Sequence, residues 1–151
     1  MESVMRKRIR SKASLRISGD TLVPDAVTRL LGCEPTMGRC KGDVIRGKRT
    51  GREHIQRTGI WSLHAEDRGS EDLNVQVAEI LDRLNPNLEA WAALAKEFRI
   101  DLFCGLFMAW WNEGVSLSPY TLAALGSRGI ELSLDLYSAP DDEDDADGSA
   151  A

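Results

Sequence analysis

The clearest pattern in the sequence is an alternation of apolar and polar positions near its C-terminal end. Ile130, Leu132, Leu134 and Leu136 alternate with polar or aromatic residues. Successive side chains of a strand point to opposite faces, so this period of two predicts a strand with one buried face. The same alternation over residues 13–18 predicts a second half-buried strand near the other end of the chain.

Helices are predicted where apolar residues recur at spacings of three and four. Such spacings occur within residues 24–31, 72–84, 88–98 and 118–125. The first and last of these segments begin with a proline at or near their first position and are followed by a glycine. Proline lacks the N–H that would be unpaired in a first turn, and glycine readily adopts the positive φ found after a last turn.

Residues 100–111 form a long apolar run in which only Asp101 is charged. The run is too short to cross a bilayer as a helix. We interpret it as a strand in the middle of a sheet, covered on both faces, with Gly105 as a candidate bulge. Trp110 and Trp111 then cannot both be buried on one side. Either one of them is an exposed anchor for a partner, or helices and loop cover both.

Two segments share a layout and suggest a fold. Leu22-Val23-Pro24 and Leu117-Ser118-Pro119 each follow a predicted strand and turn, and each helix closes on Leu-Gly. With the strand predicted over residues 60–65, we expect two β-α-β halves joined by the helical pair at 71–98. The predicted class is α+β, a ferredoxin-like fold with a mostly antiparallel sheet and helices packed on one face. The alternative is that helix starts and stops reuse proline and glycine without any repeat.

Length and charge predict the domain organisation. A chain of 151 residues suggests one domain, which we place at residues 13–138. Residues 1–60 hold 14 Lys and Arg against 6 Asp and Glu, a balance of +8. Residues 61–151 hold 5 against 18, a balance of −13, and the two give the formal net charge of −5. We expect a flexible basic N-terminus at 1–12 and a disordered acidic tail at 139–151.

The acidic tail has two interpretations: it competes for the domain's own basic patch, or it only solubilises the chain. That patch lies in the least regular stretch, residues 33–58, which predicts a long loop or an exposed hairpin with cations spaced by glycines. Lys41 and Asp43 are expected to form a local ion pair there. The candidate partner-binding residues are Arg39, Lys41, Arg46, Lys48, Arg49 and Arg52, joined by Trp61 and Trp111.

Several kinds of chemistry find no support in the sequence. Gly42 to Lys48 reads Gly-x-x-x-x-Gly-Lys, but Arg49 follows where a phosphate-binding loop needs Ser or Thr. The three cysteines form no short-spaced pair, and His54 and His64 complete no zinc motif. We therefore predict no catalytic residues, no metal and no cofactor. The odd cysteine count and the lack of a signal or membrane segment favour reduced thiols in a cytoplasm.

The order of the motifs resembles a known family. Leu15-Arg16-Ile17-Ser18-Gly19, Pro35-Thr36, Lys41-Gly42-Asp43 and Gly59-x-Trp61-Ser62-Leu63 resemble the bacterial family called domain of unknown function 4279. The segment from Leu117-Ser118-Pro119 to Tyr137 is similar to its closing part. The resemblance covers residues 13–137 and implies a small, soluble, bacterial α+β protein. It supplies no catalytic residues.

These observations favour a non-enzymatic protein-binding module, of an immunity or accessory type, that contacts an acidic protein partner through the exposed basic loop. The alternative is binding of RNA or another polyanion by the same loop, although the loop has no aromatic residue to stack on bases. The sequence pI of about 5.1 also makes nucleic acid a weaker expectation. An enzyme with Asp, Glu or His in a cleft is a third hypothesis.

Overall fold

The computed structural model of the chain describes residues 9–66 and 72–139. The described elements are β1 (Arg10–Gly19), α1 (Pro24–Leu31), β2 (Met37–Arg39), β3 (Val44–Arg46), β4 (Glu53–Ile55), β5 (Gly59–His64), α2 (Leu73–Asp82), α3 (Leu88–Glu97), β6 (Arg99–Phe107), α4 (Pro119–Ser127) and β7 (Glu131–Tyr137). The first strand starts at Arg10, three residues earlier than predicted. The predicted acidic tail apart from Ala139, and most of the predicted basic N-terminus, lie outside the described residues.

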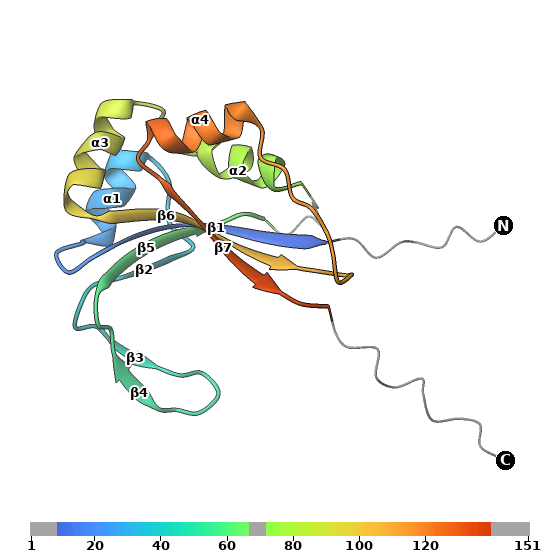
Figure 1. The fold of residues 1–151 in the computed structure, drawn as a ribbon. Helices are drawn as coiled ribbons and strands as arrows, with labels where there is room; N and C mark the ends of the chain where they lie inside the picture. The colour runs from blue at the N-terminus through green and yellow to red at the C-terminus, as the bar shows by residue number, and fades with distance from the viewer. Residues whose placement is uncertain (1–8, 67–71, 140–151) are drawn as a thin grey trace, which may run out of the picture.

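The main sheet has five strands in the order β2-β5-β1-β6-β7. Neighbouring strands are antiparallel except for the parallel pair β6 and β7. Figure 1 shows the four described helices over one face of this sheet and the hairpin β3–β4 on the other side. The predicted α+β class, with helices on one face of a mostly antiparallel sheet, is therefore confirmed.

The two predicted β-α-β halves differ in topology. In the second half, β6, α4 and β7 form a crossover between parallel neighbours. In the first half, β1 and β5 are antiparallel neighbours. The reason is that the chain passes through β2 and the hairpin after α1, and so enters β5 in the reverse direction. The shared Leu-x-Pro and Leu-Gly signals thus mark helix ends and do not fix how the flanking strands pair.

The hydrophobic core lies between the sheet and the helices. Leu15 and Ile17 of β1 and Leu102 of β6 point toward the helices and are fully buried. Two tryptophans fill the remaining space, and each donates its indole N–H. The Nε1 of Trp61 donates to Oγ1 of Thr28 at 3.0 Å, and that of Trp91 to the carbonyl of Asn85 at 2.7 Å. Both rings are thereby buried without an unpaired polar atom.

Short polar residues begin the helices, as the sequence indicates. Asp72 caps α2 by accepting from the N–H of Asn74, and Asn87 and Ser118 cap α3 and α4 in the same way. The first helix starts at a proline without a side-chain cap, and Gly32 ends it with φ of 74°. All four described helices therefore begin and end within a few residues of their predicted bounds.

The strand β6 corrects the interpretation of residues 100–111. It ends at Phe107, and its pairing with β1 is unbroken through Gly105, so there is no bulge. Helices cover only one of its faces (Figure 1). Trp110 and Trp111 lie beyond the strand in the segment that leads to α4, and both are exposed. The alternation rule therefore does not apply to them.

Candidate functional site

The segment 40–58, called the basic hairpin below, projects from the sheet. Its strands β3 and β4 pair only over three residues each, with Val44 opposite Ile55 and Arg46 opposite Glu53. The turn is closed because Gly47 and Arg52 share a backbone hydrogen bond of 2.9 Å. Gly51 adopts a φ of 64°, which a larger residue rarely tolerates. This geometry confirms the exposed hairpin that was one of the two predictions for the segment.

Cations gather at the tip of the basic hairpin. Lys48, Arg49 and Arg52 are exposed, and no ion pair involves them within the described residues. Arg46 contacts Glu53 at 3.1 Å, but both side chains are more than half exposed, and such a pair contributes little. The tip therefore presents positive charge that the chain itself does not neutralise in the described part.

The base of the basic hairpin is held by contacts that differ from the predicted ones. Lys41 pairs with Asp20, at 2.8 Å, instead of with Asp43. This hydrogen bond, together with one from Thr58, lowers the pKa of Asp20 below its ordinary value. Asp43 accepts from the backbone N–H of Cys40 at 2.8 Å and so shapes the turn before β3. The predicted Lys41–Asp43 ion pair is wrong because Asp43 satisfies the backbone locally.

An apolar pair interrupts the charge of the basic hairpin. Val44 and Ile55 lie opposite each other and are each 65% exposed. A shallow, open hollow runs along β4 beside them, lined by Lys41, Gly42, Glu53, His54, Ile55, Gln56 and Arg57. Exposed apolar side chains with a polar rim are typical of surfaces that contact another macromolecule.

The remaining predicted site residues lie apart from the basic hairpin. Trp61 is 0% exposed, so it cannot contact a partner at the surface, and its inclusion among the partner-binding residues is wrong. Trp111 is 89% exposed, but it lies in the β6–α4 segment, which Figure 1 shows at the other end of the sheet. Arg39 lies on β2 opposite Ile60, on the side of the sheet that faces away from the helices.

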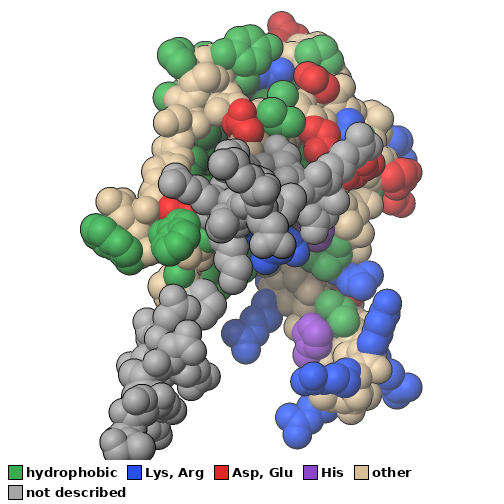
Figure 2. Space-filling view, turned by 90° about the vertical axis from the view of Figure 1, so that its right-hand side faces the viewer, with side chains coloured by type: hydrophobic (Ala, Val, Ile, Leu, Met, Phe, Trp, Pro, Cys, Tyr) green, Lys and Arg blue, Asp and Glu red, His purple; other side chains and the backbone are tan. Residues whose placement is uncertain are grey.

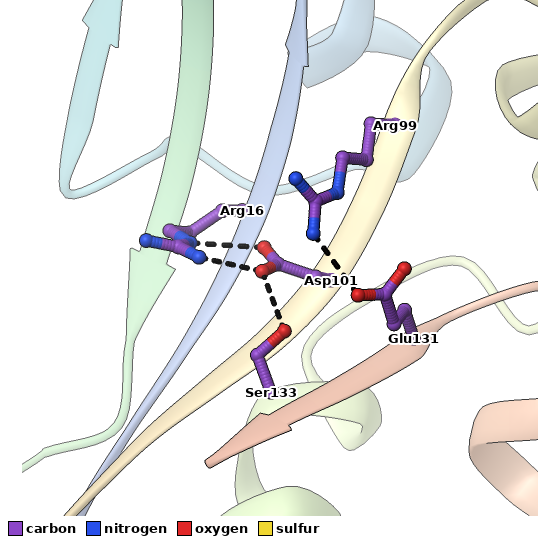
Figure 3. Close-up of polar contacts among 5 residues, drawn as sticks. All are labelled: Arg16, Arg99, Asp101, Glu131 and Ser133. Atoms are coloured by element: carbon purple, nitrogen blue, oxygen red, sulfur yellow. Dashed lines mark hydrogen bonds and ion pairs between the residues drawn. The ribbon is translucent and has the colours of Figure 1, made fainter. Parts of the chain in front are cut away.

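That side of the main sheet, called the open sheet face below, has an ordered centre. Arg16 of β1 donates two hydrogen bonds to Asp101 of β6, from Nε at 2.9 Å and from a terminal nitrogen at 2.5 Å. Ser133 of β7 donates to the same carboxylate at 3.1 Å (Figure 3). The guanidinium of Arg16 also lies over the ring of Phe103, 4.4 Å from its centroid. Three strands thus fix one flat group on this face.

Charge and burial explain the ionisation of this centre. Asp101 is only 4% exposed, and burial alone would raise its pKa. The hydrogen bonds and charge of Arg16, helped by Ser133 and Arg99, outweigh burial and hold the pKa of Asp101 below its ordinary value. The hydrogen bond to Asp101 in turn raises the pKa of Arg16. Both groups stay charged at neutral pH, so the pair is a fixed element of the face and not a proton donor.

Charge is distributed unevenly between the layers. The helices hold five acids, Asp25, Glu79, Asp82, Glu89 and Glu97, against Arg29 and Lys96. The basic hairpin holds six cations, Lys41, Arg46, Lys48, Arg49, Arg52 and Arg57, against Asp43 and Glu53. In Figure 2 the red side chains gather in the upper part of the molecule and the blue ones around the hairpin below. The positive charge of the described residues is therefore concentrated on the hairpin side.

The three cysteines differ in burial, with Cys33 and Cys40 partly exposed. Cys104 is buried in the core, and desolvation, helped by the charge of Asp101, raises the pKa of its thiol to about 12. Within residues 9–66 and 72–139, no three His, Cys, Asp or Glu side chains are grouped as a metal site would need. Over the same residues, no helix has the length and apolar character needed to span a membrane.

The sequence interpretation missed the aromatic residues of the open sheet face. Phe103 and Phe107 lie on this face of β6, and Tyr137 lies beside Phe107 on β7. Phe103 and Phe107 alternate with the buried Leu102, Cys104 and Leu106, and this period of two would have revealed them. The almost continuous apolar character of residues 100–107 hid that period.

The geometry defines a small α+β domain with one helix-covered sheet face, one open sheet face and a projecting basic hairpin. The family described as Domain of unknown function (DUF4279) matches residues 8–139. That range is most of the chain, and the chain belongs to this family. No curated protein and no solved structure matches it.

Proposed function

We propose that the chain is a non-enzymatic binding module whose basic hairpin receives an acidic segment of a protein partner. The observation that carries this proposal is the combination of an unneutralised cationic tip with an exposed apolar pair. Lys48, Arg49 and Arg52 supply the charge, and Val44 and Ile55 supply the apolar contact.

The two features have separate roles in this proposal. Charge at the tip speeds the encounter with an acidic surface and weakens with salt. An apolar pair that becomes buried contributes stability in proportion to its area, roughly 25 cal/mol per Å². A plain polyanion gains nothing from Val44 and Ile55, so their exposure favours a protein as the occupant.

A crosslinking experiment tests the proposal. A photoreactive amino acid at position 55 should capture one protein reproducibly in extracts of the native host. The same probe at position 88, an exposed leucine on α3, is the matched control. Changing Arg46, Lys48, Arg49 and Arg52 together to glutamate should abolish the capture while circular dichroism stays unchanged. Equal capture from both positions, or capture that survives the charge reversal, would refute the proposal.

RNA or another polyanion is the second candidate occupant of the basic hairpin. The observation that favours it is the gathering of Lys48, Arg49 and Arg52 without an acid at the tip. Phosphate contacts release counterions, so affinity for a polyanion should fall steeply with salt. Raising the salt from 50 to 200 mM separates the two candidates. A protein bound through Val44 and Ile55 should keep much of its affinity, whereas a roughly thousandfold loss of affinity indicates a polyanion.

We also propose a ferredoxin-like core and a bacterial, cytoplasmic setting. The order β2-β5-β1-β6 with alternating directions, and helices between β1 and β2 and between β5 and β6, supports such a core. The crossover through α4 and the edge strand β7 is then an addition to it. Three free cysteines support a reducing compartment.

A further inference from the structure

The open sheet face carries a row of flat groups separate from the basic hairpin. Its first flat group is the guanidinium of Arg16, fixed by Asp101 and stacked on Phe103 at 4.4 Å. The Arg16 side chain is still 37% exposed, so the group is held in place while part of it meets solvent. A guanidinium plane held in this way is a surface on which an unpaired base can stack.

The second flat group lies farther along β6, at Phe107, and on the neighbouring strand β7. Phe107 and Tyr137 are stacked at 4.8 Å with 7° between their planes, and Tyr137 is 46% exposed. The Tyr137 hydroxyl donates to Asp135 at 2.7 Å, which orients the ring. Phe103 and Phe107 are four residues apart on β6, or about 13 Å at the usual rise of a strand. The two stacking groups are therefore on the same face of the sheet and are spaced along the direction of β6.

Positive charge surrounds these groups, while the acids of the face are already engaged. Arg10, Lys12 and Arg39 are exposed on β1 and β2, and they have no ion pair within the described residues. Of the three acids on this face, Asp101 is paired with Arg16 and Glu131 with Arg99 at 3.0 Å, whereas Asp135 accepts a hydrogen bond from the neutral Tyr137 and keeps its negative charge. The three unpaired cations outnumber this one acid, so the charge left to attract a ligand is positive.

We propose that the open sheet face binds single-stranded nucleic acid, with bases stacked on Arg16 and on Tyr137 and phosphates facing Lys12 and its neighbouring cations. A double helix does not fit, because its bases are already stacked and paired. An acidic peptide would match the cations but would gain little from two aligned stacking surfaces. The proposal concerns a different surface from the basic hairpin and does not depend on the function proposed for it.

The test measures binding of a labelled oligonucleotide to the full chain. Fluorescence anisotropy is followed at 50 mM salt with a 12-nucleotide RNA of mixed sequence and with the DNA of the same sequence. Binding of either strand supports the proposal, and a preference for RNA assigns contacts to the 2′-hydroxyl. Tyr137→Leu should weaken binding about 5- to 150-fold, the effect of losing one stacked base. Tyr137→Phe keeps the ring and should change it less than twofold.

Two further variants separate stacking, charge and location. Log affinity falls with log salt, and Lys12→Gln should make this negative slope less steep by about 0.7, as expected for the loss of one phosphate contact to a single strand. Tyr120→Leu changes an exposed tyrosine on α4 and should have no effect. The quadruple glutamate variant of the basic hairpin should retain most of the binding. If that variant abolishes binding while Tyr137→Leu does not, the site is the hairpin and the inference is wrong.

Three other results would overturn the inference. The first is no binding of either oligonucleotide at 50 mM salt. The second is competition by polyphosphate or poly-glutamate as strong as that by unlabelled RNA, because neither competitor has bases. The third is a map of amide chemical shifts in which the oligonucleotide perturbs the helices and leaves β1, β6 and β7 unchanged.

Discussion

Replacing Asp101 by asparagine tests whether the centre of the open sheet face contributes to stability as a charged pair. The side chain is 4% exposed and accepts two hydrogen bonds from Arg16 and one from Ser133. Asparagine keeps the shape and one acceptor oxygen but loses the negative charge. The variant thus removes the ionic part of the contact with little change in packing.

The expected loss lies between that of a buried and that of a surface ion pair. Breaking a fully buried pair costs about 3–5 kcal/mol, and exposed pairs contribute about 0–1 kcal/mol. Because water reaches about a third of the Arg16 side chain, the higher range must be discounted. We expect Asp101→Asn to lower the free energy of unfolding by about 2 kcal/mol at pH 7. Glu131→Gln breaks the neighbouring exposed pair with Arg99 and should cost about 0.5 kcal/mol or less.

The pH dependence gives a second, independent measure. The pKa of Asp101 is lower in the folded than in the unfolded chain, so its contribution is complete above the ordinary carboxyl pKa. It is lost as the pH falls through the folded-state value, whereas the asparagine variant has no such group. The stability difference should therefore shrink below about pH 4.

Urea unfolding of the wild type and both variants at pH 7, 5, 4 and 3 measures these differences. A loss below 0.5 kcal/mol for Asp101→Asn at pH 7 would refute the account of the centre. So would a difference between wild type and Asp101→Asn that is the same at pH 3 as at pH 7. A loss from Glu131→Gln as large as that from Asp101→Asn would mean that burial does not distinguish the two pairs.

Three other predictions concern the core. Gly59→Ala should lower the free energy of unfolding by about 1–3 kcal/mol, because the new methyl would lie 2.7 Å from the carbonyl oxygen of Gly19. Gly114→Ala is the control, since a methyl there would meet nothing within 4 Å. Equal urea midpoints of the two variants would contradict the prediction. Gln76→Leu should lower the free energy of unfolding by about 1–3 kcal/mol. It leaves the Ala13 N–H and the Ser11 carbonyl without the hydrogen-bond partners they have at 2.9 and 2.8 Å. Thermal unfolding checks this, and an unchanged midpoint would argue against it. In folded protein at pH 8, iodoacetamide should modify Cys33 and Cys40 well before Cys104, whose thiol pKa is raised to about 12; mass spectrometry that finds all three labelled at one rate would contradict this burial.

Local signals in the sequence predicted the elements well. The start of α4 at Pro119 and the end of α1 at Gly32 depend on backbone preferences within a single turn. The alternation over residues 130–136 likewise predicted the strand β7, because the period of a strand is visible in a few residues. The buried apolar face was predicted only in part, since Ile130 is buried and Leu132 partly so, whereas Leu134 and Leu136 are exposed. These features need no knowledge of distant parts of the chain.

Features that depend on distant contacts were not predictable in the same way. The partner of Lys41 is Asp20, and nothing in the spacing of the two residues indicates that a sheet edge brings them together. The antiparallel pairing of β1 with β5 depends on the path of the chain through residues 37–58. Of the predicted site, the hairpin cations lie together, whereas Trp61 faces the core. The shared face of Trp61 and Leu63 does indicate a core position, and the assignment of Trp61 to the surface site conflicts with that pattern.

The way the basic hairpin is closed at its base has an evolutionary consequence. The N–H of Gly42 donates to the carbonyl of Gln56 at 2.9 Å, and the N–H of Gln56 donates to the carbonyl of Asp43 at 2.8 Å. These bonds clamp the two ends together, and the residues between them pair in a sheet of their own. The cost of closing a longer loop grows only with the logarithm of its length. An exchange or lengthening of this arm is therefore compatible with an unchanged fold of the scaffold that carries it.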